Sequence, residues 1–478
     1  MSGDTAASDG GNAIERAGRR LADVVERWMP RPFLFAIILT YTVFVVGVGV
    51  EDVGPFEMVA FWVDGFWAFL TFAMQMVLIL MTGFVIAYHP RVNDTLQGLA
   101  GIPNDGKQAV VLVGVFSMVM GWVHWGLSLI VGAIFAREMG KVAHERGVDV
   151  HYPLLCVAGY MGLGLTWHWG LSGSAPLLLN TPGNEFIEQE ILTEVVPTSQ
   201  TIFSAYGLAL TALSILFAAA VLYLLTPAPE RADGITEYVP EDELFGATPD
   251  GGKPTDAERA SDESADDGPV PAERIDNSRL LGGLVALTGV AMVAYTLATQ
   301  GLDGWNLNVV NFAFLFSGLL IYQRPALYRE RFGEAAEAAA GIILLFPFFA
   351  GIQGMMNASG LSQTIADGLF AVSTTETFSV IAWLTGAVVN LFVPSGGGEW
   401  IVIGPSVVEA AQDLGVPVGQ ATMAYAVGDA HTNLFNPFWA IPLLAITGIK
   451  AREMFGYAIA MLLALIPFLA VVLFVLPY

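Results

Sequence analysis

The stretch WHWGLSGSAP, residues 167–176, breaks an apolar segment that runs from Pro153 to Leu179. It places a histidine, two serines and a closing proline among glycines and tryptophans. A helix that spans a bilayer satisfies its backbone internally and carries few polar side chains, because unpaired polar groups are costly in hydrocarbon. The stretch therefore predicts a helix interrupted at membrane depth, which either holds a ligand or carries a serine nucleophile.

The composition of the whole chain is that of a protein with many membrane spans. Of its 478 residues, 55% are hydrophobic and 13% are charged, whereas soluble proteins carry about 25% charged residues. Several apolar runs reach the roughly 20 residues that a helix needs to cross a bilayer. These runs are 33–50, 66–88, 202–225, 281–297 and 455–476. We therefore expect an all-α polytopic membrane protein.

An acidic segment, residues 226–278, divides the chain into two hydrophobic halves. It contains 15 acidic and four basic residues, and it is rich in proline and glycine, so it cannot bury a core. The net charge of the chain, −24 with 20 Lys and Arg residues, is typical of a halophilic protein in a high-salt cytoplasm. The predicted organisation is a cytoplasmic N-terminal tail with an amphipathic helix (1–32), a first membrane repeat (33–225), an acidic disordered cytoplasmic linker (226–278), a connecting transmembrane helix (279–300) and a second membrane repeat (301–478).

Each half presents the same order of segments: two spans, two apolar runs broken by small and polar residues, and a final clean span. The first broken runs, 109–136 and 378–410, are centred on GWVHWGLS and VPSGGGEW. The second, 153–182 and 420–447, contain the opening stretch and GDAHTNLFNPFW. Secondary transporters use interrupted helices in inverted repeats to place a site at the midplane. We predict about nine spans in two inverted-topology repeats, with broken helices and two opposed re-entrant hairpins.

The distribution of Lys and Arg supports this topology. If the first broken run of each half is a hairpin, the predicted external loops 51–65, 183–200, 299–307 and 357–377 contain no basic residue. Lys and Arg then gather on the cytoplasmic side, as the positive-inside rule requires. The N-terminus and the acidic linker are predicted to be cytoplasmic and the C-terminus external, in a multi-pass protein of the plasma membrane.

The broken segments supply the candidate site. No Lys or Arg lies within a predicted span, so an anion has to be held by polar side chains and by the backbone N–H groups of half-helices. The stretch PSGGGEW suits this purpose, because its glycines allow close backbone approach before a new helix begins. The predicted substrate-binding residues are His168, Ser172, Gly173, Ser174, Ser395, Gly396, Gly397, Gly398, Asn433 and Asn436.

Two acidic residues at the breaks of the second half, Glu399 and Asp429, are predicted to couple transport to an ion, H⁺ or Na⁺. Buried carboxylates are costly and usually functional, although a charge at a helix N-terminus is the alternative for both. Additional candidates are His124, Trp167, Trp169 and His431, for which a structural role is equally open. No carboxylate lies at a spacing that would orient the membrane histidines around a metal, so no metal site is predicted.

Several motifs carry a resemblance to the short-chain fatty acid transporter family, which is placed in a wider ion transporter superfamily. They are WVDGFWAFLTFAMQM (62–76), WGLSLIVGAIFARE (125–138), GLSGSAPLL (170–178), TIFS (201–204), VPSGGGEW (393–400) and GDAHTNLFNPFWAIP (428–442). The resemblance implies uptake of short carboxylates such as butyrate and acetoacetate, and a fold of two repeats with opposed hairpins. His168 matches the family pattern, whereas this chain has Trp169 in place of a glycine, His124 in place of an asparagine, His431 in place of a tryptophan and Glu399 in place of a glutamine.

Two other functions are open from the residues alone. The motif GLSG (170–173) fits the pattern of rhomboid-like intramembrane serine proteases, with Ser172 as nucleophile and His431 as its base. Broken helices also line pores, so a facilitative anion channel is the third alternative. We find no ATP-binding or cofactor motif, which favours a gradient-driven transporter without catalytic residues. Its predicted partners are the carboxylate, a coupling ion and the lipid bilayer, not nucleic acid, and a monomer and a homodimer are both open.

Overall fold

The structure, a computed structural model, describes residues 32–245, 270–392 and 395–478, and these form helices and loops without a β-strand. This confirms the predicted all-α class, while the amphipathic helix predicted in the N-terminal tail lies outside the described residues. The first half contains α2 (Pro32–Val50), α3 (Pro55–Gly65), α4 (Leu70–Ala87), α5 (Pro90–Ala100), α6 (Gly106–Val123), α7 (Trp125–Arg146), α8 (Tyr152–Met161), α9 (Ser174–Leu179), α10 (Glu185–Glu188) and α11 (Ala205–Leu225). The second half contains α15 (Arg279–Gln300), α16 (Leu307–Tyr322), α17 (Pro325–Ser359), α18 (Leu361–Val372), α19 (Phe378–Phe392), α20 (Gly396–Leu414), α21 (Val418–Thr432), α22 (Pro437–Thr447) and α23 (Ala451–Val475).

Many of these helices have the length and composition of membrane spans. Among the described residues, six are long and apolar enough to cross a bilayer: α4, α6, α11, the segment around α15, α17 and α23. Shorter apolar helices lie within α2, α16 and α19. An apolar helix of this length buries all its backbone polar groups in its own hydrogen bonds, which is the condition for a stable span in lipid. The chain is therefore a multi-pass membrane protein.

The same helix contacts recur in the two halves. In the first half, α6 packs on α8, and α7 packs on α4 and α5. In the second half, α19 packs on α21, and α20 packs on α17 and α18. These equivalent contacts follow the order of segments read from the sequence and support the predicted repeat. The inversion of one half relative to the other stays a prediction.

Close packing of α19 against α21 depends on a glycine. A Cβ on Gly428 would lie 2.7 Å from the backbone nitrogen of Ala387 and closer still to the carbonyl oxygen of Trp383. Because the obstacle is backbone rather than a flexible side chain, any larger residue at this position would push the two helices apart. This contact fixes the position of Asp429, the next residue along α21.

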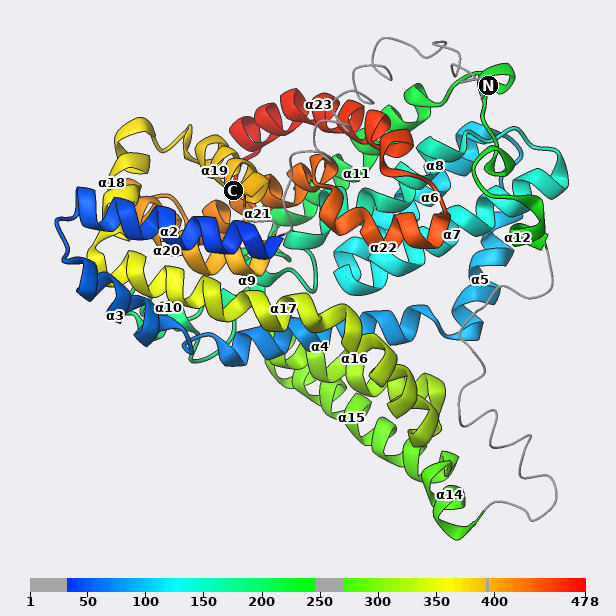
Figure 1. The fold of residues 1–478 in the computed structure, drawn as a ribbon, viewed down its shortest axis with the longest axis horizontal. Helices are drawn as coiled ribbons and strands as arrows, with labels where there is room; N and C mark the ends of the chain where they lie inside the picture. Colours follow the sequence, from blue (N-terminus) through cyan, green and yellow to red (C-terminus); the bar gives the residue numbers. More distant parts are fainter. Residues whose placement is uncertain (1–31, 246–269, 393–394) are drawn as a thin grey trace, which may run out of the picture.

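Helices α15 and α16 project from the body of the molecule as an arm (Figure 1). Helix α15 packs chiefly on α16, which connects it to α4 and α17, and 17% of the apolar window of the segment 271–304 is buried. Leu284, Leu287 and Tyr295 are among its exposed apolar side chains. Lipid is the natural cover for such a surface, which supports the prediction that residues 279–300 form a connecting transmembrane helix.

Part of the predicted disordered linker is folded against the bundle. Residues 226–245 form short turns and α12 (Glu241–Phe245), and Ile235, Val239 and Leu244 are buried. The carbonyl oxygen of Asp233 accepts a hydrogen bond from the backbone N–H of Tyr152 at 2.8 Å. The prediction of disorder is therefore wrong for this part, because its few apolar residues are spaced to dock on α7 and α8. A further helix, α14 (Pro271–Asp276), precedes α15, and residues 246–269 lie outside the described residues.

Candidate substrate site

Three interrupted segments meet inside the bundle. Helix α8 continues as a π-helical turn (Gly162–Thr166) and a 3-10 turn (Trp167–Trp169), and the chain becomes extended at Gly170. Helix α21 ends at Thr432, and a 3-10 turn leads to α22. The N-terminal part of α20 lies against α9, and α21 packs on both turns that follow α8. The interruption predicted near Gly170 is therefore present, and it faces the breaks of the second half.

A chain of buried polar side chains connects these segments. Ser174 Oγ lies 2.7 Å from His168 Nε2, and His168 Nδ1 lies against the Asp429 carboxylate. The backbone N–H of Ala175 donates to the same Nε2 at 3.3 Å. This bond identifies Nε2 as an acceptor and assigns the ring proton to Nδ1, toward Asp429. Ser174, His168 and Asp429 are all fully buried.

Glu399 extends this chain from the first turn of α20. Its carboxyl group lies near Asp429 and Tyr425, and it is fully buried, with no hydrogen-bond partner among the described residues for either of its oxygens. We refer to His168, Asp429 and Glu399 as the titratable cluster.

A cavity of about 30 Å³ lies beside the titratable cluster. Its polar lining consists of Ser174, Ser395, Gly396 and Gly397, from the starts of α9 and α20. The rest of the lining is apolar or aromatic: Met76, Trp125, Leu163, Trp167, Ile342, Phe346 and Trp439. One water needs about 10–15 Å³, so the cavity has room for about two waters. A small organic acid would enter only after the walls move apart.

Several hydrogen-bond donors are available around this cavity. The first N–H groups of a helix have no acceptor within it, and in α20 they belong to Gly396 and Gly397. The Ser395 hydroxyl accepts from the N–H of Gly398 at 3.3 Å, which leaves its proton to donate. Within the described residues, the indole N–H groups of Trp125 and Trp167 have no hydrogen-bond acceptor. This donor set suits a carboxylate, whose two oxygens accept about four hydrogen bonds.

Glycine at position 396 allows the backbone of α20 to touch the titratable cluster. A Cβ on Gly396 would lie 2.7 Å from Asp429 Oδ2 and 2.9 Å from His168 Cε1, and it would also collide with Trp167. The positive end of α20 therefore lies directly over the His168–Asp429 contact. A ligand held by Gly396 would be close enough to alter the charge balance of the cluster.

Three residues predicted for the site in the first half have other positions. Ser172 Oγ accepts a hydrogen bond from the backbone N–H of Trp125 at 2.9 Å, so it holds the first turn of α7. The Trp169 indole donates to Thr211 Oγ1 on α11 at 3.1 Å. Gly173 is the residue before α9 and lies against the His168 carbonyl group. None of the three lines the cavity.

The other two candidate histidines, His124 and His431, contact backbone groups rather than the cavity. His124 precedes α7 and its Nδ1 accepts from the N–H of Leu127 at 3.1 Å. His431 Nε2 lies 3.1 Å from the carbonyl oxygen of Leu462 on α23. Since Ser172 and His431 have separate partners, the structure does not form the nucleophile–base pair considered for a rhomboid-like protease.

The two candidate asparagines lie at the break that follows α21. Asn433 Nδ2 donates to the Leu163 carbonyl at 3.0 Å, and its Oδ1 accepts from Asn390. Asn390 also donates to the carbonyl of Asp429 at 2.8 Å. Asn436 is buried, and its carbonyl accepts from the Tyr160 hydroxyl at 3.4 Å. These residues shape the break but do not line the cavity.

Some residues of the site were not predicted from the sequence, although the positions of a few of them in the sequence could have indicated that they belong to it. Trp125 and Trp439 belong to the broken segments already singled out, and Tyr425 lies one helical turn before Asp429. Met76 and Phe346 lie in helices whose residues are mostly apolar. Their side chains face the cavity because of how α4 and α17 pack, and no local pattern indicates it.

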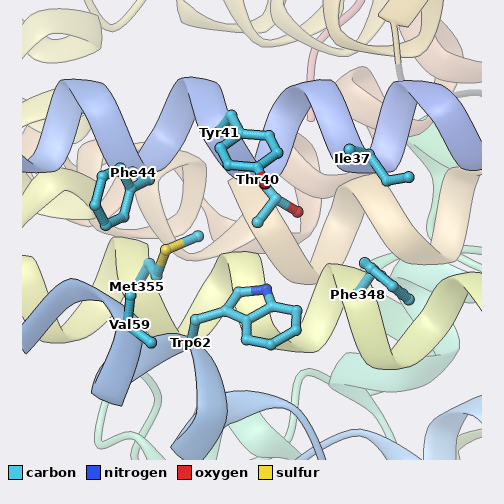
Figure 2. A pocket seen from close by; sticks show the side chains of 8 residues that line it. All are labelled: Ile37, Thr40, Tyr41, Phe44, Val59, Trp62, Phe348 and Met355. Carbon is cyan, nitrogen blue, oxygen red and sulfur yellow. The ribbon is translucent and has the colours of Figure 1, made fainter. Parts of the chain in front are cut away.

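A larger cavity of about 440 Å³ lies between α2, α3 and α17 (Figure 2). Its lining is mostly apolar, and the hydroxyl of Thr40 already donates to the carbonyl of Ala36 at 2.7 Å. Tyr41 and Val59 in this lining are exposed, at 67% and 48%, so the cavity opens on the outer surface. Apart from the Trp62 indole N–H and the Tyr41 hydroxyl, its described lining offers no free donor and no helix N-terminus, so it is a poorer match for an anion than the small cavity.

Comparison with known proteins shows similarity over nearly the whole chain. The family model described as "Short chain fatty acid transporter" matches residues 13–476. A protein of Escherichia coli named "Putative short-chain fatty acid transporter" is 37% identical over 450 residues, which cover 94% of this chain and 97% of that protein. A protein of the same name from Haemophilus influenzae is 32% identical over 460 residues, 95% of this chain and 98% of that protein.

Similarity also extends to a solved structure. The crystal structure of the YdaH transporter of Alcanivorax borkumensis matches with a TM-score of 0.57 at 16% identity, over 92% of this chain and 98% of that chain. At this identity, the likeness concerns the fold alone. It agrees with an all-helical membrane protein.

Proposed function

Because the chain belongs to the short-chain fatty acid transporter family, we propose that it carries short-chain monocarboxylates of the butyrate and acetoacetate class across the plasma membrane by cation symport. The lining of the cavity supports this proposal most directly. Hydroxyl and backbone donors from Ser174, Ser395 and Gly396 adjoin aromatic and aliphatic walls. A short fatty acid has the same division between one carboxylate and a short apolar chain.

Each part of the substrate has proposed contacts. Ser174, Ser395 and the first N–H groups of α20 bind the carboxylate, with the indole N–H of Trp167 as a further donor. Trp439 and Phe346 flank the acyl chain. Before the substrate binds, His168 Nε2 accepts the single Ser174 proton; on binding, the hydroxyl turns to donate to the carboxylate, and Nε2 keeps the Ala175 N–H as its donor. Through Ser174, His168 links the substrate to the titratable cluster. This division places the substrate anion next to the coupling residues.

The coupling ion in this proposal is a proton, bound by the titratable cluster. Glu399 and Asp429 lie near each other, and both are fully buried. A carboxylate substrate would add another negative charge beside them. Because uncompensated charge in an apolar interior is costly, proton uptake with the substrate keeps the loaded site close to neutral.

Uptake of labelled butyrate into proteoliposomes under separate pH and sodium gradients tests this proposal. Butyric acid itself crosses lipid, so protein-free liposomes set the background. We expect an inward proton gradient to accelerate uptake, and Asp429→Asn and Glu399→Gln to lose that response while they retain substrate exchange. Asp413→Asn, at the exposed end of α20, is the matched control. A response to sodium alone would refute proton coupling, and uptake insensitive to both gradients would favour a facilitative channel.

The proposed orientation has its own test. In a Cys156→Ala background, cysteines introduced by Gly54→Cys and Glu188→Cys should react with an impermeant thiol reagent from outside intact cells. A cysteine introduced by Lys450→Cys should react only after the membrane is opened. The reverse pattern would overturn the assignment of the N-terminus and the acidic linker to the cytoplasm.

One observation favours a second candidate function. Ser174, His168 and Asp429 stand in the order hydroxyl, imidazole, carboxylate that activates a serine nucleophile. A hydrolase would be labelled at Ser174 by a fluorophosphonate probe, and Ser174→Ala would abolish the label. We expect no label, because a cavity of about 30 Å³ has no room for a scissile substrate beside Ser174.

A further inference from the structure

A second polar cavity, of about 430 Å³, lies at the other end of the helices that enclose the substrate site. Three basic residues line it, Arg137, Lys141 and Arg331. Glu138 is the acidic residue of the lining, and it contacts Lys141 at 3.4 Å. In a chain with 20 basic and 44 acidic residues, three cations around one cavity are a local concentration, and each of them has one carboxylate partner. We name this cavity the basic vestibule.

The basic vestibule lies on the same four helices as the substrate cavity. Helix α7 contributes Trp125 to the small cavity and Arg137 to the vestibule. Helices α4, α17 and α22 likewise contribute residues to both. Twelve residues along α7 correspond to about 18 Å at 1.5 Å per residue. The two cavities are therefore aligned along α4, α7, α17 and α22, one nearer each end of these helices.

The cations of the vestibule face inward, while two of their partners are at the rim. The Arg137 side chain is 24% exposed and contacts Glu243, which is 59% exposed, at 3.4 Å. The Arg331 side chain is 14% exposed and contacts Glu334, 44% exposed, at 3.0 Å. Exposed ion pairs of this kind contribute about 0–1 kcal/mol. A small anion that enters the cavity could therefore displace either carboxylate.

Helix α12 of the folded acidic segment closes this cavity. Leu244 is buried and forms part of the lining. Glu243 beside it contacts Arg137, and Phe245 stacks on the ring of His144 with centroids 5.8 Å apart. The acidic segment thus puts a carboxylate on a vestibule cation at the position where a carboxylate ligand would bind.

We propose that the basic vestibule is a second binding site for a small organic carboxylate, and that α12 closes it. The Glu243 carboxylate, which contacts Arg137, competes with this ligand. The identity of the anion rests on the proposed transport function; the site itself rests on the cavity and its three cations. Binding in the vestibule concentrates the anion at one end of the helices that enclose the substrate site. In this proposal, α12 must move before the anion can enter or leave the vestibule.

Substrate protection of a cysteine in the vestibule tests the proposal. In full-length Cys156→Ala protein in detergent, Asn93→Cys places a thiol in the lining, and its rate of reaction with a maleimide is measured against sodium butyrate. Sodium chloride keeps the ionic strength constant. We expect protection in the parent protein. Loss of a charge-assisted contact in Arg331→Gln should raise the half-protecting concentration about threefold to tenfold, and Lys141→Gln should act in the same direction.

The acidic segment supplies a matched pair of variants. Glu243→Gln should lower the half-protecting concentration about twofold to threefold, whereas Glu230→Gln, the same charge change outside the cavity, should leave it unchanged. Ser174→Ala should leave protection intact, because the inner site is separate. Three outcomes would overturn the proposal. They are no protection in the parent protein, loss of protection in Ser174→Ala, and equal protection in the parent, Arg331→Gln and Lys141→Gln. Protection without butyrate uptake would support the vestibule and refute the transport function.

Discussion

Ser174 and Ser172 are two positions apart, and their contacts predict opposite effects of the same substitution. Ser174→Ala removes a hydroxyl that lines the cavity and that we assign to the substrate carboxylate. A hydrogen bond to a charged group contributes about 1.5–3 kcal/mol, and 1.4 kcal/mol is a factor of ten. We therefore expect the KM for butyrate uptake to rise about 10- to 100-fold. Stability should change little, because His168 Nε2 keeps the Ala175 N–H as a partner.

Ser172→Ala removes the acceptor of the buried Trp125 N–H instead. An unsatisfied buried N–H costs about 1–3 kcal/mol, so we expect a lower melting temperature with an unchanged KM. Both variants are measured side by side, by uptake of labelled butyrate into proteoliposomes and by thermal unfolding in detergent. A raised KM in Ser172→Ala together with an unchanged KM in Ser174→Ala would refute the assignment of the carboxylate to Ser174.

Three further predictions follow from other contacts. Gly428→Ala should lower the yield of folded protein or its melting temperature, by about 1–3 kcal/mol, because its Cβ would meet the backbone of α19; Gly341→Ala, where nothing lies within 4 Å, is the control in the same thermal assay. Trp169→Phe should cost about 1 kcal/mol through the lost bond to Thr211 and leave the KM unchanged. Desolvation, and less strongly Glu188, raises the pKa of Glu185, the first residue of α10; the native state then binds this proton more tightly than the unfolded state, so stability falls as pH rises through this range. Glu185→Gln should raise the melting temperature near neutral pH but not at about pH 4, and the same effect at both pH values would contradict this cause.

Much of the fold could be predicted because its physical signals are local. Apolar length identifies most of the spans, and glycine, proline and serine identify the breaks, as at Gly170 and Gly396. The folded part of the acidic segment could not be predicted in this way. Its composition forbids an independent core, but Ile235 and Leu244 dock on helices far away in sequence. The composition of a segment indicates whether it can fold alone, but it does not indicate whether the segment packs on the surface of other helices.

The candidate site shows the same limit at the level of single residues. The motif GLSGSAP indicates that serines lie at a break, but it cannot say which one faces the cavity. That choice depends on Trp125, the first residue of α7. Its backbone N–H donates to the Ser172 hydroxyl oxygen, whereas the Ser174 hydroxyl contacts His168. Predicting it requires the relative placement of α7 and α9, which is a tertiary property.

The position of Glu399 gives its carboxyl group a clear part in the proposed mechanism. A glutamine at this position could not bind or release a proton. In the proposal, Glu399 and Asp429 lie near the helix end that we assign to the substrate carboxylate. Negative charge on the titratable cluster and on the substrate would then be opposed by the same apolar interior. Such a charge balance would link substrate and proton without any long-range conformational signal, and the contact of Gly396 with His168 and Asp429 is what makes it possible.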